Sequence, residues 1–313
     1  MTCIISFSTR RFAVQVSDRR VSPAEPGDQA NRAIVFLAPD GVLSVGYTGA
    51  AHVGDSPADV WLAELLWGAR TQAAGAGVAG QAATTCVADA VYRIRRALDG
   101  RVDLSKDFEI LVSGFRRKAG RWLPVNLRVR RAPGGPAKAL GRLMLSGRHV
   151  VVAAVGSRPT VPELSAAVQR IASRANGAIT ADESAALLIG LVRTVAARDP
   201  GVSTDLMTTI VQPPQDGPIV CRFSSLHHGG RIVLQKPGAL SLCTPDLGVL
   251  GPVECSPWVI GQTAIMNPAP FLGGAGPKLW GEGYAVVVES SRPAPLTTKG
   301  VLVAGPNQGA VSP

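Results

Sequence analysis

Runs of predicted strands alternate with pairs of predicted helices along the first two thirds of the chain. The expected strands occupy residues 3–7, 12–16, 33–37, 42–47, 108–115, 123–130, 150–155 and 206–211. Two helices are expected between the fourth and fifth of these strands, and two more between the seventh and eighth. Helices that come in pairs between runs of strands predict sheets covered by helix layers, and they argue against a doubly wound fold.

Each predicted helix has its own start or stop signal. Ser56-Pro57 opens the first, with Ser as the N-cap and Pro at the first helical position. The second, over residues 85–98, repeats apolar side chains at helical spacing on one face. The third begins near Pro162 and is expected to stop at Asn176-Gly177. The fourth begins with a capping-box pattern, Thr180-Ala181-Asp182-Glu183.

A proline-rich segment, residues 212–218, predicts a domain boundary. The expected domains are residues 1–215 and residues 216–313. Beyond the boundary the apolar segments are short and are interrupted by Gly and Pro, which predicts a small β-rich extension. Its last residues, 305–313, are expected to form a loose tail.

The composition narrows the class of protein. The net charge is +10, but the arginines are scattered and are not interleaved with aromatic residues, so we expect no nucleic-acid partner. No apolar run approaches the ~18 residues of a membrane span, so we expect no membrane association. The five cysteines form no CxxC pair and are odd in number, which favours reduced thiols in the cytoplasm.

No cofactor or metal site is expected. His227 and His228 are adjacent, so on a strand they would point to opposite faces, and no acidic residue follows them at ligand spacing.

The most distinctive chemical feature is Thr2, directly after the initiator Met1. If Met1 is removed, Thr2 carries a hydroxyl nucleophile and, in its own α-amine, a base with a reference pKa near ~8. Sixteen residues later comes Asp18, within the string Ser17-Asp18-Arg19-Arg20-Val21-Ser22. A carboxylate near an N-terminal amine and a cation fixes the position and charge of that cation.

The element order and these motifs together resemble the N-terminal-nucleophile hydrolases, and most closely the proteasome β subunits with their bacterial relatives of the HslV and ancestral-β types. The resemblance covers about residues 2–211. It implies an α+β fold, a four-layer αββα sandwich in which two antiparallel sheets lie between helix pairs. The β-rich extension is unusual for that group.

The resemblance also implies roles for individual residues. Thr2 matches the nucleophile, Asp18 the buried acidic residue and Arg20 the basic residue of the family's Asp-x-Arg motif. Gly49 falls where a glycine N–H helps to form the oxyanion hole. Ser157, after Gly156, matches a serine whose hydroxyl would hold the α-amine or the catalytic water.

Four residues depart from the family pattern. Asp199 and Ser203 match residues that hydrogen-bond the N-terminal residue, but their spacing is one residue longer than usual, and Asp205 is a possible substitute. Arg158 stands where the family has a glycine. Arg32 stands where it has its catalytic lysine, and an arginine supplies positive charge but does not readily release a proton.

The predicted function is therefore a threonine-type hydrolase of peptide or other amide bonds that assembles as a homo-oligomer. An ATPase or regulatory partner cannot be identified from the sequence. One alternative is a degenerate, non-catalytic scaffold subunit, which Arg32 and Arg158 favour. Others are an N-terminal-nucleophile amidohydrolase of a small molecule, Cys3 as the nucleophile after removal of two residues, and an α+β protein whose N-terminal Thr is a coincidence.

Overall fold

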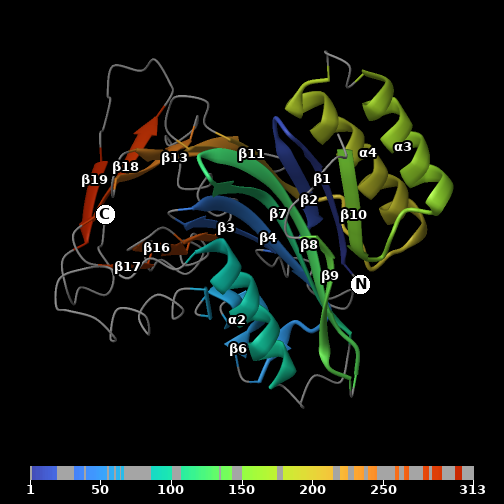
Figure 1. The fold of residues 1–313 in the computed structure, drawn as a ribbon, viewed down its shortest axis with the longest axis horizontal. Coiled ribbons are helices and arrows are strands. Elements are labelled where there is room, and N and C mark those ends of the chain that lie inside the picture. The colour runs from blue at the N-terminus through green and yellow to red at the C-terminus, as the bar shows by residue number, and fades with distance from the viewer. Residues whose placement is uncertain are drawn as a thin grey trace.

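Two β-sheets face each other in the middle of the molecule, and helices cover their outer faces (Figure 1). The computed structural model describes residues 2–19, 32–38, 40–54, 56–59, 61–63, 65–66, 86–100, 107–133, 135–142, 150–174 and 179–213. Beyond residue 213 it describes the backbone of strands between residues 219 and 304.

The first sheet has nine strands in the order β10-β1-β2-β11-β12-β13-β14-β18-β19. Their bounds are β1 Cys3–Thr9, β2 Ala13–Asp18, β10 Val150–Gly156, β11 Leu206–Gln212, β12 Ile219–Ser224, β13 Gly229–Gln235, β14 Ala239–Thr244, β18 Tyr284–Ser290 and β19 Gly300–Ala304. The neighbouring pairs are antiparallel except β14 with β18. Strand β1 lies between β10 and β2, so the N-terminus is in the interior of this sheet.

The second sheet has eight strands in the order β17-β16-β15-β3-β4-β7-β8-β9. Their bounds are β3 Ala33–Ala38, β4 Gly41–Thr48, β7 Phe108–Lys118, β8 Arg121–Arg131, β9 Ala137–Arg142, β15 Trp258–Ile260, β16 Ala264–Asn267 and β17 Lys278–Gly281. The expected strands over residues 108–115 and 123–130 are longer than predicted. Strands β7 and β8 continue to Lys118 and from Arg121, which leaves only two turn residues between them.

Helices α3 (Val161–Arg174) and α4 (Ala181–Arg198) cover the outer face of the first sheet. The predicted capping box starts α4: Glu183 N–H donates to Thr180 Oγ1 and the Thr180 N–H donates to Glu183. Apolar residues of α4, including Leu188 and Val192, pack on β1 and β2 in a buried cluster. The expected stop of the preceding helix at Asn176-Gly177 lies outside the described residues.

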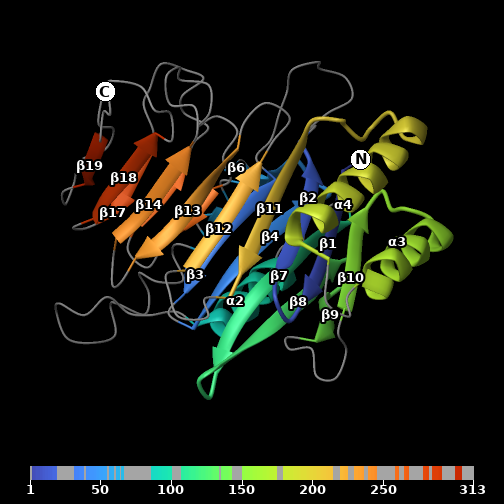
Figure 2. The ribbon, with the colours of Figure 1, turned by 90° about the horizontal axis from the view of Figure 1, so that it is seen from above.

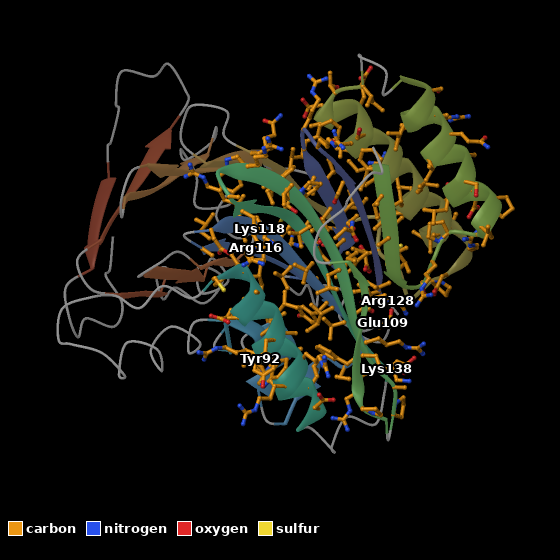
Figure 3. All side chains as sticks on the ribbon, in the orientation of Figure 1. Tyr92, Glu109, Arg116, Lys118, Arg128 and Lys138 are labelled. Atoms are coloured by element: carbon orange, nitrogen blue, oxygen red, sulfur yellow. The ribbon has the colours of Figure 1, made fainter. Side chains whose placement is uncertain are left out.

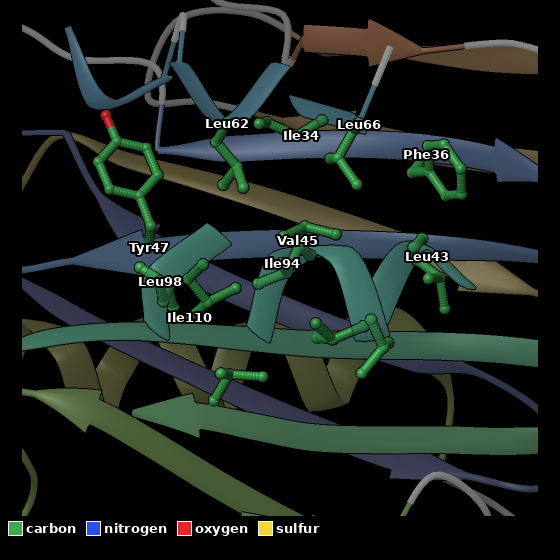
Figure 4. Packing of buried hydrophobic residues seen from close by; sticks show 14 of the residues in the cluster. Ile34, Phe36, Leu43, Val45, Tyr47, Leu62, Leu66, Ile94, Leu98 and Ile110 are labelled. Carbon is green, nitrogen blue, oxygen red and sulfur yellow. The ribbon is translucent and has the colours of Figure 1, made fainter. Parts of the chain in front are cut away.

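Helix α2 (Val87–Asp99) and a helical segment within residues 58–66 cover the outer face of the second sheet. Leu62, Leu66, Ile94 and Leu98 pack against strand residues such as Val45 (Figure 4). The expected helix start at Ser56-Pro57 is slightly early. These two residues form the short strand β6, paired with β5 (His52–Val53), and helical residues begin at 58.

Polar side chains from both sheets meet in the buried interface between them. Ser44 and Thr209 share a hydrogen bond of 2.6 Å, and the Ser113 hydroxyl donates to Gln15 at 3.1 Å. Asn126 Nδ2 donates to Ser6 at 2.9 Å and also contacts Ser8. Because buried polar groups are costly without partners, this network fixes the relative position of the sheets.

The fold is therefore the predicted α+β arrangement of four layers, αββα. The elements described after residue 216 are strands, and they join both sheets. β12 pairs with β11 (Figure 2), and β15 pairs with β3. The division into domains at residues 215–216 stays a prediction. Within the described residues, no helix is long and apolar enough to cross a membrane.

Candidate functional site

Thr2 is buried at the start of β1, and its backbone is held by the end of β10. The Ser157 N–H donates to the Thr2 carbonyl at 2.8 Å. Gly156 makes this approach possible: its φ is +72°, and a Cβ there would lie 1.9 Å from the Thr2 carbonyl oxygen. The same Cβ would lie 2.8 Å from Thr48 Oγ1. Gly156 is therefore packed closely against both Thr2 and Thr48, which are far from it in the sequence.

Asp18, the last residue of β2, lies beside the start of β1 with no exposed surface. Its Oδ1 accepts the Cys3 N–H at 2.8 Å, and its Oδ2 accepts the Ser203 N–H at 3.1 Å. The carboxylate thus joins the residue after Thr2 to the loop that follows α4. Since the two bonds use both oxygens, Asp18 is fixed in orientation.

The charge on Asp18 depends on its surroundings. Burial raises the pKa of its carboxyl to about 6, and the Arg32 charge and the two N–H hydrogen bonds oppose that rise. Arg32 itself is 2% exposed, and its guanidinium lies over the Tyr47 ring at 5.4 Å from the centroid. Arg32 is therefore a buried positive charge close to Asp18.

Ser157 connects Thr2 to Asp199. The Ser157 hydroxyl makes a short hydrogen bond to Asp199 Oδ2, while Asp199 Oδ1 accepts the Gly201 N–H at 2.9 Å. The hydrogen bond from Ser157 is the main cause that lowers the pKa of Asp199. Asp199 is thus ionised at neutral pH, and it holds Ser157 rather than Thr2.

Ser203 contacts Asp18 and Asp205, and Asp205 contacts Arg19. Ser203 reaches Asp18 through its backbone N–H, and its hydroxyl accepts the Asp205 N–H at 2.9 Å. Asp205 forms an ion pair with Arg19 at 3.3 Å. The suggested substitution of Asp205 for Asp199 is not needed to complete this set of contacts.

Gly49 has a structural reason to be glycine. Its φ is +119°, and a Cβ there would lie 2.1 Å from the Asp107 carbonyl oxygen. The tight passage of β4 past the start of β7 therefore requires glycine. Its assignment to an oxyanion hole stays a prediction. Arg20 and Met1 lie outside the described residues.

Cys3 faces the core between the first sheet and its helices. Burial raises the pKa of its thiol, and the Asp18 charge raises it further. A protonated thiol is a poor nucleophile, so the structure disfavours Cys3 in that role.

Sequence reasoning missed Glu109, which is also close to the start of β1. Glu109 Oε2 accepts the Gly156 N–H at 3.1 Å, and its carboxylate pairs with Arg128, Arg130 and Arg158. Glu109 and the alternating Arg128 and Arg130 can be seen in the sequence, but their pairing depends on the register of β7 with β8, which the sequence does not show.

No protein-family model and no curated protein matches the sequence. Among solved structures, the chain is similar to Anbu from Hyphomicrobium sp. strain MC1 (a Gly-1 mutant), with 14% identity over 68% of this chain and 82% of that one and a TM-score of 0.45. It is also similar to Anbu (ancestral beta-subunit) from Yersinia bercovieri, with 11% identity over 67% of this chain and 81% of that one and a TM-score of 0.44. At such low values nothing about the site follows from these similarities.

Proposed function

We propose that this chain is a threonine-type N-terminal-nucleophile hydrolase that cleaves peptide or other amide bonds after removal of Met1. The observation that carries the proposal is the support around Thr2. Ser157 holds its carbonyl at 2.8 Å, and Asp18 holds the next N–H at 2.8 Å. A threonine fixed from both sides, beside a buried arginine and carboxylate, has the pre-organisation that a nucleophile requires.

In the proposed reaction, Thr2 Oγ attacks the substrate carbonyl and its proton passes to the Thr2 α-amine. The tetrahedral intermediate collapses as the C–N bond breaks, and the ammonium returns the proton to the leaving amine. The resulting ester on Thr2 is hydrolysed by a water molecule that the same amine deprotonates. The Gly49 N–H is the proposed oxyanion donor.

In the proposed reaction the role of Arg32 is electrostatic. Positive charge beside the α-amine favours its neutral form, which is the form that accepts a proton. Arginine does not release its own proton at neutral pH, so Arg32 cannot act as a shuttle. Ser157 is better suited to assist: its hydroxyl hydrogen is directed to Asp199, which leaves its oxygen lone pairs to accept an N–H of the amine.

Hydrolysis of a peptide library by the purified full chain tests the proposal, with Thr2→Ala and Thr2→Ser as variants. We expect Thr2→Ala to lose activity by on the order of 10³-fold or more and Thr2→Ser to keep part of it. Activity that is unchanged in Thr2→Ala would exclude this mechanism. Cleavage of small amides without cleavage of peptides would identify an amidohydrolase of small molecules.

The second candidate function is a non-catalytic scaffold, which the arginine at position 32 favours. It predicts that Arg32→Lys gains no activity and that neither wild type nor variant hydrolyses any amide. The hydrolase proposal predicts instead that Arg32→Lys retains or increases turnover, because lysine keeps the charge and can also transfer a proton.

A homo-oligomeric state and a cytoplasmic location belong to the same proposal. The free thiols of Cys3 and Cys86 agree with a reducing compartment. Light scattering of the purified protein at several concentrations measures the assembly, and a monomer at every concentration would contradict it.

A further inference from the structure

A group of basic side chains lies beside the turn that holds Thr2. Glu109 Oε2 accepts the Gly156 N–H at 3.1 Å, and Gly156 is the residue packed against the Thr2 carbonyl. The same carboxylate contacts Arg158 Nη2 at 3.1 Å and Arg128 at shorter range. Glu109 and Arg128 are seen together at the end of the sheets where the N-terminus lies (Figures 1 and 3).

The strand register places the members of this group in one row across four strands. Thr48 of β4 pairs with Glu109 of β7, Glu109 with Arg130 of β8, and Arg130 with Lys138 of β9. Residues directly opposite each other point to the same face of a sheet. Because Thr48 is in contact with Gly156, the whole row lies on the face that is turned toward the start of β1.

The positive charges in this group outnumber the negative ones. The cations are Arg128, Arg130, Arg158 and, by strand register, Lys138. The carboxylates that form ion pairs with the three arginines are Glu109 and Asp107. The Glu109 side chain is 5% exposed, whereas those of Arg130 and Arg158 are 41% and 44% exposed. The carboxylate is thus inside the group, and the exposed ends of the arginines carry the surplus positive charge.

The backbone of Arg158 is held in place by contacts on both sides. The neighbouring Ser157 is anchored to Thr2 and Asp199, and Arg198 Nη2 donates to the Arg158 carbonyl at 3.0 Å. Arg198 is itself fixed by an ion pair with Glu163 at 2.8 Å. Both contacts of Arg158 with Glu109 are made by Nη2. The planar guanidinium has several N–H donors, so it can also bind a second carboxylate.

We propose that Arg158 and Arg130 form a carboxylate-binding subsite, so that the substrates of Thr2 carry an acidic group near the scissile amide. This inference rests on the proposed hydrolase function. It also gives a role to Arg158, the residue that departs from the family's glycine: the arginine extends the turn that holds Thr2 into a recognition element for negative charge.

The test compares peptides that differ only in Glu against Gln, placed in turn at each position around the cleavage site found with a peptide library. With wild-type protein we expect kcat/KM to be at least about 10-fold higher for the Glu peptide at its best position. The preference should shrink as salt rises, because exposed charges are screened. Arg158→Gln should reduce the preference at least about fivefold, because it removes a charge-assisted contact with the Glu side chain while Arg130 remains.

Lys118→Gln is the matched control, because Lys118 is an exposed cation at the other end of β7 and is far from Glu109 (Figure 3). It should leave the preference unchanged. Lys138→Gln is a second variant within the group, and it should weaken the preference less than Arg158→Gln does.

Fluorescence anisotropy with the same labelled peptides and the Thr2→Ala full chain makes the test independent of catalysis. Tighter binding of the Glu peptide, lost in the Thr2→Ala, Arg158→Gln double variant, supports the subsite even if no peptide is hydrolysed. Equal kcat/KM and equal binding for Glu and Gln peptides at every position would overturn it, as would a preference that persists without Arg158. An absence of any hydrolysis bears on the proposed function instead.

Discussion

Asp18 is a buried carboxylate whose ionisation is linked to the stability of the fold. Folding raises its pKa from a usual value of 3.8 to about 6, so the folded state binds the proton more tightly than the unfolded state. The stabilising contribution is therefore full below pH 3.8 and is lost as pH rises through about 6. We expect the free energy of unfolding of the wild type to fall, relative to Asp18→Asn, by about 2 to 3 kcal/mol across this range.

Urea denaturation of both proteins at pH values from about 4 to about 7 measures this difference. Parallel stability curves for the two proteins would show that the pKa of Asp18 is not raised.

Gly156 controls the position of Thr2 through its backbone. A methyl group there would overlap the Thr2 carbonyl oxygen, and its φ of +72° is unfavourable for other residues. We expect Gly156→Ala to lower the free energy of unfolding by about 2 to 4 kcal/mol. It should also abolish the reactivity of Thr2 in the protein that remains folded.

Gly190→Ala is the control for this substitution. Gly190 lies in α4 with open space around the position of a Cβ, so alanine should stabilise the helix by about 0.5 to 1 kcal/mol. Thermal unfolding of the two variants should shift in opposite directions. Equal shifts would contradict the tight contact at Gly156.

The candidate site residues Thr2, Asp18, Arg32 and Ser157 were expected from the family resemblance together with their spacing. They lie at or next to the ends of β1, β2, β3 and β10, and their catalytic roles stay predictions. Glu109 and Arg19 were missed because their partners are distant in the sequence. Glu109 pairs with Arg128, Arg130 and Arg158, and Arg19 pairs with Asp205. Such pairs depend on strand register, which no local pattern specifies.

At the scale of elements, helix α4 depends on its capping box. Thr180 is exposed, and its hydroxyl accepts the Glu183 N–H at 3.1 Å. Thr180→Ala should therefore cost about 1 kcal/mol of stability. Thr194→Ala is the matched control, because the Thr194 hydroxyl only returns to the Gly190 carbonyl within the helix. Equal losses in the two variants, measured by chemical denaturation, would refute the capping role.

The helices and the central strands of the first two thirds were predictable because their signals are local. Capping residues and apolar periodicity identified α2 and α4, and alternating strands identified β7 and β8. Strands β9, β12 and β14 were not predicted, because each is short and lies next to glycine or proline. The polar surface between the sheets was also missed, since single Ser, Gln and Asn residues in apolar strands do not show which partners they meet.

At the scale of the whole molecule, the C-terminal strands complete both sheets. β12 covers the edge of β11, and β15 covers the edge of β3. A chain that ends at residue 213 would expose both edges, and exposed edges promote aggregation. We expect this truncated chain to be insoluble, or to be degraded faster than the full chain in limited proteolysis. A soluble, monomeric and protease-resistant fragment would instead show that residues 1–213, nearly all of the expected first domain, fold independently.

The central claim is that Thr2 becomes the N-terminal residue and acts as the nucleophile. The most direct measurement is the intact mass of the purified full chain before and after treatment with a β-lactone. We predict that native protein lacks Met1 and gains one acyl adduct, which peptide mapping locates on Thr2 and which Thr2→Ala does not form. Native protein that retains Met1, or an adduct that persists in Thr2→Ala, would contradict it.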